Sequence, residues 1–201
     1  LKMSKDIYQA VKERRSYYNI NDKKIVPEKK VEEVVEHAVK YTPTSFNSQT
    51  GRVLILFNEE HNKFWNIVEK NLRPVVPEED FDSTREKIDG FRSGYGTVLF
   101  FEDMEIVENL QQRFPLYSEN FPKWSQHSSG MLQYNVWTIL EAEGLGASLQ
   151  HYTELIEEDV RSEWEINDDW RFVAQMPFGN PVEEPDEKEF EPLKNRIEIY
   201  K

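Results

Sequence analysis

The stretch SQHSSGMLQYNVWTILEAEGLGASLQHY, residues 125–152, decides the fold of this chain. Residues 125–140 contain no Asp, Glu, Lys or Arg, although 31% of all residues are charged. The apolar side chains are spread around a helical wheel, which predicts a central helix that is buried on most sides. They are Met131, Leu132, Tyr134, Val136, Trp137, Ile139, Leu140 and Ala142. Because 201 residues offer little material to cover such a helix, we expect a subunit interface to form its second wall.

A glycine turn ends the predicted helix. Gly144 suits a left-handed C-terminal cap, and Gly146 allows the backbone to approach another group closely. The six residues that follow, 147–152, contain no Asp, Glu, Lys or Arg. We therefore expect residues 147–152 to form a platform of backbone groups for a flat ligand.

Length and composition favour one domain and exclude several classes of partner. The formal charge of −13 argues against binding nucleic acid or an anionic membrane, because the long-range field would repel phosphates. The chain has no cysteine, which fits a reducing cytosol, and 38% of its residues are apolar, which is enough for a core. Neither a run of eighteen apolar residues nor a signal-peptide pattern is present, so we expect a soluble, cytoplasmic protein.

Periodicity predicts the remaining elements on both sides of the central helix. Ser4 can cap a first helix, and Thr153 can cap an acidic helix that runs through Trp164. Further helices are predicted near residues 27–39, 64–72, 77–91 and 106–114, and an aromatic loop at 115–124. Buried-strand patterns lie at 52–57, 97–101 and 171–176, the last one ended by Pro177, and 181–191 is an acidic strap. The alternating residues 197–200 predict a final strand that would pair with an edge, for which a partner subunit is one candidate.

Two polar segments are candidates for binding. Arg14, Arg15 and Ser16 follow the first helix, where they either complement its C-terminus or form a phosphate clamp. Residues 41–51 form a loop rich in hydroxyl and amide groups, which in the simplest interpretation is a solvated turn. Its Ser45, Asn47 and Gln49 alternate, so in an extended segment they would point the same way and could bind the polar edge of a heterocycle.

The sequence does not match the common motifs for dinucleotide binding, metal binding or hydrolysis. Gly144-Leu145-Gly146 has leucine at 149 where a dinucleotide fingerprint needs glycine, and it follows a helix instead of a strand. The four histidines show no metal-ligand spacing, and no GxSxG elbow surrounds Ser148. The sequence therefore gives no support for a Rossmann site, a metal site or a hydrolase triad.

Four motifs, taken in order, resemble the FMN-dependent nitroreductase family. They are Glu13-Arg14-Arg15-Ser16, Ser45-x-Asn47-x-Gln49, Gly144-Leu145-Gly146-Ala147 and Lys194-x-Arg196. Residues 124–152 look like the subgroup related to the yeast fatty-acid-repression protein and its bacterial nitroreductase counterparts. The resemblance covers nearly the whole chain and implies one domain over residues 1–201. The implied fold is an α+β sandwich, a central mixed β-sheet flanked by helices, in a homodimer with a central interface helix and an exchanged C-terminal arm.

The resemblance also implies a cofactor site and its residues. Arg14, Arg15 and Ser16 would hold the phosphate and ribityl side of FMN together with Lys194 and Arg196. Ser45, Asn47 and Gln49 would come from the partner chain, and Gln150 and His151 would lie along the flavin with backbone amides near its N5 atom. Tyr18 stands where many relatives have a basic residue, and Thr50-Gly51 replaces a frequent Pro-Trp. No metal is implied.

The function we expect is that of an FMN-dependent NAD(P)H oxidoreductase that reduces nitroaromatic or quinone acceptors by ping-pong hydride transfer. The electron donor would be NADH or NADPH, and the partners would be a second copy of the chain and a small-molecule acceptor. One alternative is a flavin-binding regulatory or stress-response protein, in lipid, fatty-acid or oxidative signalling, with incidental reductase activity. Another is an interaction protein with an empty cleft.

Overall fold

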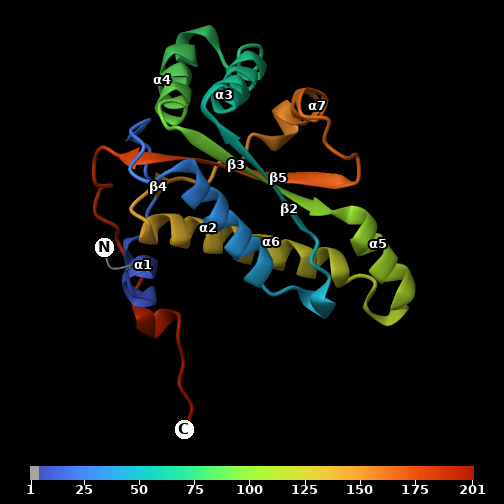
Figure 1. Ribbon diagram of the computed structural model, residues 1–201. Coiled ribbons are helices and arrows are strands. Elements are labelled where there is room, and N and C mark those ends of the chain that lie inside the picture. Colours follow the sequence, from blue (N-terminus) through green and yellow to red (C-terminus); the bar gives the residue numbers. More distant parts are fainter. Residues whose placement is uncertain (1–4) are drawn as a thin grey trace.

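The computed structural model describes residues 5–201 and places helices on both faces of one β-sheet (Figure 1). The helices are α1 (Ile7–Glu13), α2 (Glu28–Tyr41), α3 (Asn58–Leu72), α4 (Phe81–Arg92), α5 (Met104–Arg113), α6 (Phe121–Ala142) and α7 (Thr153–Glu163). The strands are β1 (Ile20–Asn21), β2 (Gly51–Phe57), β3 (Gly96–Asp103), β4 (Gly146–Ala147) and β5 (Trp170–Pro181). Short 3₁₀ turns are η1 (Ser45–Asn47), η2 (Glu78–Asp80), η3 (Pro115–Tyr117) and η4 (Leu193–Asn195). The predicted α+β class is confirmed.

The sheet has the strand order β1-β5-β3-β2, and β4 pairs with β5 outside this path. All ladders between these strands are antiparallel. The predicted mixed sheet would contain parallel as well as antiparallel pairs. Within residues 5–201, the only parallel pairing is the isolated bridge between Ser16 and Ala147. That bridge joins the segment after α1 to the segment after α6.

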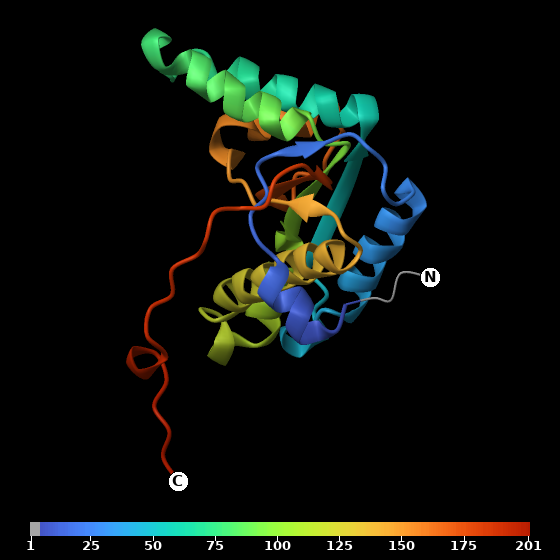
Figure 2. The same ribbon diagram turned by 90° about the vertical axis from the view of Figure 1, so that its left-hand side faces the viewer.

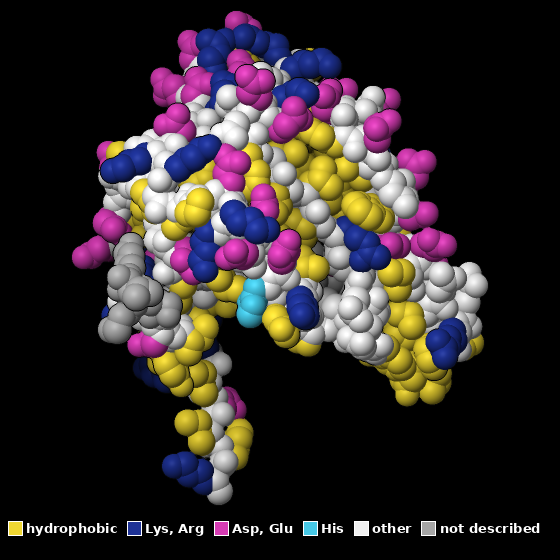
Figure 3. Space-filling view, in the orientation of Figure 1, with side chains coloured by type: hydrophobic (Ala, Val, Ile, Leu, Met, Phe, Trp, Pro, Cys, Tyr) yellow, Lys and Arg dark blue, Asp and Glu magenta, His cyan; other side chains and the backbone are white. Residues whose placement is uncertain are grey.

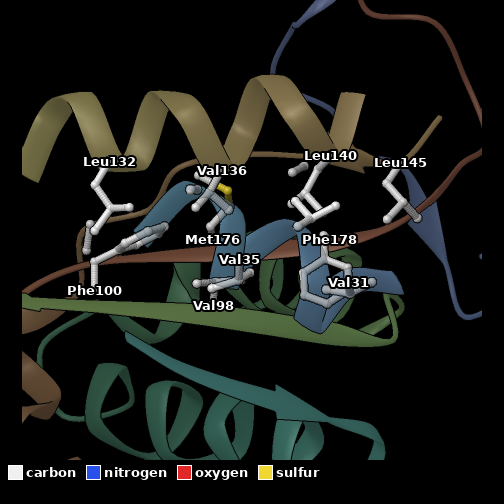
Figure 4. Close-up of a cluster of buried hydrophobic side chains, with 14 of the residues drawn as sticks. Val31, Val35, Val98, Phe100, Leu132, Val136, Leu140, Leu145, Met176 and Phe178 are labelled. Atoms are coloured by element: carbon white, nitrogen blue, oxygen red, sulfur yellow. The ribbon is translucent and has the colours of Figure 1, made fainter. Parts of the chain in front are cut away.

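Alternation along β3 creates one apolar core on each face of the sheet. Val98 and Phe100 pack on the α2 and α6 side, whereas Leu99 and Phe101 pack on the side of α3, α4 and α7. Successive side chains of a strand point to opposite faces, so a strand buried on both sides is continuously apolar. Figure 4 shows the first core, in which side chains of α6 point toward the sheet.

Helix α6 is only partly covered within the single chain. Leu132, Val136 and Leu140 lie in the core, whereas Met131 and Tyr134 remain 42% and 41% exposed. The predicted burial on most sides is therefore incomplete in one chain, and Met131 and Tyr134 belong to an open face. The helix also begins earlier than predicted, at Phe121, so part of the predicted aromatic loop forms its first turn.

Strand β5 is longer than predicted because Pro177 does not end it. Pro177 lies opposite Thr97 in the ladder with β3, and its carbonyl oxygen accepts a hydrogen bond from the backbone N–H of Ser148 at 3.3 Å. A proline is tolerated where the ladder does not require its missing N–H. The strand continues to Pro181, where it pairs with Ile20 of β1.

The two chain ends differ from the sequence-based predictions. Ser4, the predicted cap of α1, lies outside the described residues, and the side chain of Asp6 accepts the capping bond from the N–H of Gln9. The predicted strand at 197–200 is wrong for the single chain, because these residues are exposed and pair with no described strand. Figures 1 and 2 show this tail extending away from the rest of the molecule. A β-strand needs a neighbouring edge, and here none is within reach.

No helix within residues 5–201 is long and apolar enough to cross a membrane.

Candidate functional site

The segment after α1 lies against the glycine turn after α6. The backbone N–H of Tyr17 donates to the carbonyl oxygen of Ala147 at 3.0 Å, next to the Ser16–Ala147 bridge. Gly144 has φ of 88°, which confirms the left-handed cap. A Cβ atom on Gly146 would lie 2.9 Å from Cβ of Tyr17, which confirms the predicted close approach. Two motifs that are about 130 residues apart thus meet at one place.

Arg14 is held by the central helix and retains unused hydrogen-bonding capacity. Its guanidinium carbon lies 4.2 Å from the ring centroid of Trp137 and 5.9 Å from that of Tyr134. The Nε atom of Arg14 is buried and has no hydrogen-bond partner among the described residues. A buried N–H donor without a partner is costly, so a ligand that accepts from this group would be bound favourably.

Arg15 lies close to Arg14 in the sequence but serves another contact. Its Nη2 donates to the carbonyl oxygen of Asp186 at 2.6 Å and so attaches the segment after β5. A groove of about 320 Å³ lies here, lined by residues 15–19 and 183–186, and three of its residues are acidic. Tyr18 lines the same groove, is 53% exposed, and has its ring centroid 6.1 Å from that of Phe91. The buried hydroxyl of Tyr17 is 3.3 Å from Glu184, and burial together with Glu141 and Glu184 raises the pKa of Tyr17 to about 12.

The segment after the glycine turn offers free backbone donors. The N–H of Gln150 donates to Gln175 O at 2.7 Å, and the N–H of Gln175 donates back to Gln150 O at 2.9 Å. Because N–H groups alternate in direction along an extended strand, those of Leu149 and His151 point away from β5. Neither donates a hydrogen bond to a described residue. These two N–H groups are therefore available to a ligand, in the segment for which the sequence predicts a platform.

The polar loop does not have the extended geometry predicted from the alternation of Ser45, Asn47 and Gln49. Ser45–Asn47 form the 3₁₀ turn η1, and φ is 57° at Phe46, 51° at Asn47 and 50° at Gln49. Such a turn does not point alternate side chains in one direction, so the geometric argument for this loop is wrong. The reason lies in Phe46, whose ring is drawn into an aromatic cluster with its centroid 5.1 to 6.2 Å from four other rings. These belong to Phe114, Tyr117, Phe121 and Trp124.

Along α6, the polar loop and the arginine segment lie far apart. Phe46 of the loop packs on the first turn, at Phe121 and Trp124, whereas Arg14 packs on Trp137. At 1.5 Å of rise per residue, Phe121 and Trp137 are separated by about 24 Å. Lys194 and Arg196 lie on the exposed tail. A single chain therefore brings Arg14 and Ser16 to the glycine turn but does not bring the loop or the tail to them.

Sequence reasoning missed two polar side chains near this region. Glu102, in the second half of β3, is 1% exposed, and its Oε2 accepts from Thr50 Oγ1 at 2.5 Å and from Ser125 Oγ at 2.6 Å. Burial raises the pKa of Glu102, against the opposing effect of Ser125 and Thr50. Arg171, near the start of β5, lines a cavity with His151. A charged residue at the end of an apolar strand pattern was the available signal in both cases.

This chain belongs to the nitroreductase family, whose model matches residues 11–180. It is 38% identical to the putative nitroreductase HBN1 of Saccharomyces cerevisiae over 170 residues, which cover 85% of this chain and 83% of HBN1. The solved nitroreductase CinD of Lactococcus lactis, in complex with chloramphenicol, is 40% identical, with a TM-score of 0.90 and coverage of 98% of this chain and 100% of CinD. A putative nitroreductase of Desulfovibrio desulfuricans in complex with FMN shares the fold, with 17% identity, a TM-score of 0.71 and 98% coverage of each chain.

These findings confirm the resemblance, including its yeast and bacterial relatives. The chain is an oxidoreductase of the nitroreductase type.

Proposed function

We propose that this protein is an FMN-dependent NAD(P)H oxidoreductase that reduces nitroaromatic or quinone acceptors. The observation that carries the proposal is the guanidinium of Arg14, fixed on Trp137 with a buried, unused Nε donor beside the Ser16–Ala147 bridge. A phosphate group fits this arrangement because arginine donors and a serine hydroxyl match phosphate oxygens. The relative solved with FMN supports this cofactor, and the relative solved with chloramphenicol supports a nitroaromatic acceptor.

In this proposal each group of site residues has a separate task. Arg14 and Ser16 hold the phosphate, and Arg15, Lys194 and Arg196 add positive charge around it. Gln150 and His151 lie along the isoalloxazine, with the free N–H groups of Leu149 and His151 directed at its polar edge. When bound, FMN would supply the hydride chemistry, and the protein would supply orientation and electrostatics.

The same proposal requires two copies of the chain. Ser45, Asn47 and Gln49 belong to a loop whose Phe46 packs on Phe121, about 24 Å along α6 from Trp137. In this proposal the loop reaches the cofactor of a partner subunit instead of its own. The open face of α6, with Met131 and Tyr134, would be covered by the same face of the partner. The tail would then pack on the partner, and Figure 3 shows hydrophobic atoms along it. Its exposed apolar residues are Phe190, Leu193, Ile197, Ile199 and Tyr200.

Absorbance spectroscopy and steady-state kinetics test the function. We expect the purified protein to bind one FMN per chain and to oxidise NADH or NADPH continuously when a nitroaromatic acceptor is present. Initial-rate plots at several acceptor concentrations should be parallel, because donor and acceptor would use one cleft in turn. A protein that binds FMN but shows no acceptor-dependent turnover would instead be the regulatory alternative.

A further inference from the structure

Arg171 is a half-buried cation that forms no salt bridge with any described residue. The other half-buried arginines of the helices and strands are paired: Arg52 with Asp103, Arg85 and Arg92 with Glu69, and Arg161 with Glu157. Arg171 makes neither a salt bridge nor a side-chain hydrogen bond to any residue in 5–201, in a chain with 38 carboxylates. Arg14 shares this property, and we have already assigned it to a ligand. An arginine left without an acceptor in an acidic protein indicates that an external anion supplies one.

A β-bulge places Arg171 on the side of the sheet that faces α6. The ladder of β3 and β5 shifts register between Phe100 and Phe101, so that Val173 is the extra residue. Beyond the bulge Arg171 lies opposite Glu102, and directly opposed residues point to the same face. Glu102 accepts a hydrogen bond from Ser125 of α6, so the face that Glu102 and Arg171 share is the one covered by α6. Without the bulge, the arginine would point toward the other core.

The bulge brings Arg171 into a cavity of about 390 Å³ next to the platform. Gln126 and Ser129 of α6 line one side of it, and His151 lines another. Ser129 Oγ accepts from Nε2 of Gln133 at 3.0 Å, so its own proton is free to be donated. Val173 adds an apolar wall. The cavity thus offers several donors and a surface for an aromatic ring.

Two carboxylates face this cavity or lie near it. Glu154, at the start of α7, is exposed and lines the cavity. Glu102 is buried and points its Oε2 at Thr50 and Ser125. Burial raises the pKa of Glu102, and the nearby charge of Arg171 opposes this rise without forming a salt bridge. Glu154 is screened by solvent, whereas the half-buried guanidinium is screened less. Arg171 is therefore the dominant charge for a ligand inside the cavity.

We propose that this cavity is a subsite for an anionic group, a carboxylate or a phosphate, carried by a substrate of the reductase. The inference rests on the proposed function and extends it to the substrate class. The planar fork of Arg171 binds two oxygens of the anion, and the Ser129 hydroxyl donates to one of them. The anion comes either from a carboxylate on the acceptor or from the additional phosphate that distinguishes the NADP from the NAD form of the dinucleotide.

Calorimetric titration of the oxidised holoenzyme tests the subsite with two matched ligand pairs. 4-Nitrobenzoate and 4-nitrobenzamide differ in charge at one group, and NADP⁺ and NAD⁺ differ by one phosphate. We expect Arg171→Gln to weaken binding of the anionic member of at least one pair ten-fold or more, and that of its neutral or less charged counterpart less than two-fold. Arg171→Lys should recover part of the loss. The benzoate pair identifies the acceptor as the source, and the dinucleotide pair identifies the donor.

Arg113→Gln is the matched control, because it removes one positive charge from an exposed position on α5. It should leave all four affinities within two-fold. The proposal is overturned if Arg171→Gln changes both members of each pair equally, or if Arg113→Gln has the same effect. If the Arg171→Gln enzyme turns over normally and its affinities for all four ligands are unchanged, the subsite is refuted but the proposed function is not. A protein that binds no FMN would refute the proposed function, while titration of the purified protein with 4-nitrobenzoate would still decide the subsite.

Discussion

The guanidinium of Arg14 lies 4.2 Å from the ring centroid of Trp137, so the side chain two residues before Ser16 is fixed to the central helix. A guanidinium over an indole ring is attracted by the electrons of the ring. The contact leaves the buried Nε of Arg14 without an acceptor. Arg14, the candidate phosphate-binding residue, and α6, which has an open face, therefore belong to one rigid unit.

The first prediction concerns that arginine. Arg14→Ala should weaken FMN binding by about 1.5 to 3 kcal/mol, because a charge-assisted hydrogen bond to phosphate is lost. The dissociation constant is measured by fluorescence titration of the apoprotein. Lys12→Ala is the control, since Lys12 is exposed one half-turn earlier and carries the same charge. Equal affinities for the parent protein and the Arg14 variant would remove Arg14 from the phosphate site.

The second prediction concerns the open face of α6. Met131→Glu should convert a homodimer into monomers, because an unpaired carboxylate would be buried in the interface. Light scattering after size-exclusion chromatography measures the mass. Leu155→Glu on α7 is a matched control, with 40% exposure against 42% for Met131. It should leave the mass unchanged. A parent protein that is monomeric at micromolar concentration would refute both the dimer and the shared site.

The third prediction concerns the pH dependence of stability. His61 is 1% exposed, and burial lowers its pKa to about 4. Its Nε2 donates to the carbonyl oxygen of Arg92, and its Nδ1 accepts from Oγ1 of Thr97. Between pH 6.5 and 4 the unfolded chain binds a proton that the folded chain does not, so stability is lost as pH falls through this window. The loss should reach about 3 kcal/mol at pH 4, as measured by urea denaturation.

A comparison of variants isolates the contribution of this histidine. His61→Gln should flatten the pH profile between pH 6.5 and 4, whereas His37→Gln, at an exposed position of α2, should not. If both variants keep the slope of the parent protein, other groups cause it.

The fourth prediction concerns Glu102. Glu102→Ala should lower the free energy of unfolding by about 2 to 5 kcal/mol, because the buried hydroxyls of Thr50 and Ser125 lose their acceptor. Glu102→Gln keeps an accepting oxygen and should stay within about 1 kcal/mol of the parent protein. The exposed Glu105→Ala serves as a control, with an expected change within about 0.5 kcal/mol. A loss as large for glutamine as for alanine would mean that the charge, and not the acceptor, is required.

Local periodicity predicted most of the fold. The alternation of residues 98–101 and the helical pattern of residues 125–140 each depend on neighbours close in sequence, so the two-sided burial of β3 and the existence of α6 could be predicted directly. The extension of β5 through Pro177 could not, because it depends on β3 and β4 accommodating a residue that lacks an N–H. The unpaired tail was likewise beyond prediction for one chain, since an alternating pattern cannot show whether an edge is available.

The candidate site was predicted less well than the fold. The roles of Gly144 and Gly146 were predicted correctly, because a left-handed cap and a close backbone approach are local requirements that glycine meets. The geometry of the polar loop was decided by Phe46 and its distant aromatic neighbours, and the orientation of Arg171 by a bulge. Both depend on packing between elements that no short window of sequence contains.

The central claim is that the chain binds FMN and uses it to pass electrons from a nicotinamide donor to an acceptor. One anaerobic absorbance experiment on the FMN-loaded protein tests it most directly. We predict that one equivalent of NADH or NADPH per chain bleaches the visible flavin band, and that a nitroaromatic added afterwards restores it. A protein that binds no FMN, or whose flavin band remains unchanged with both donors, would contradict the account.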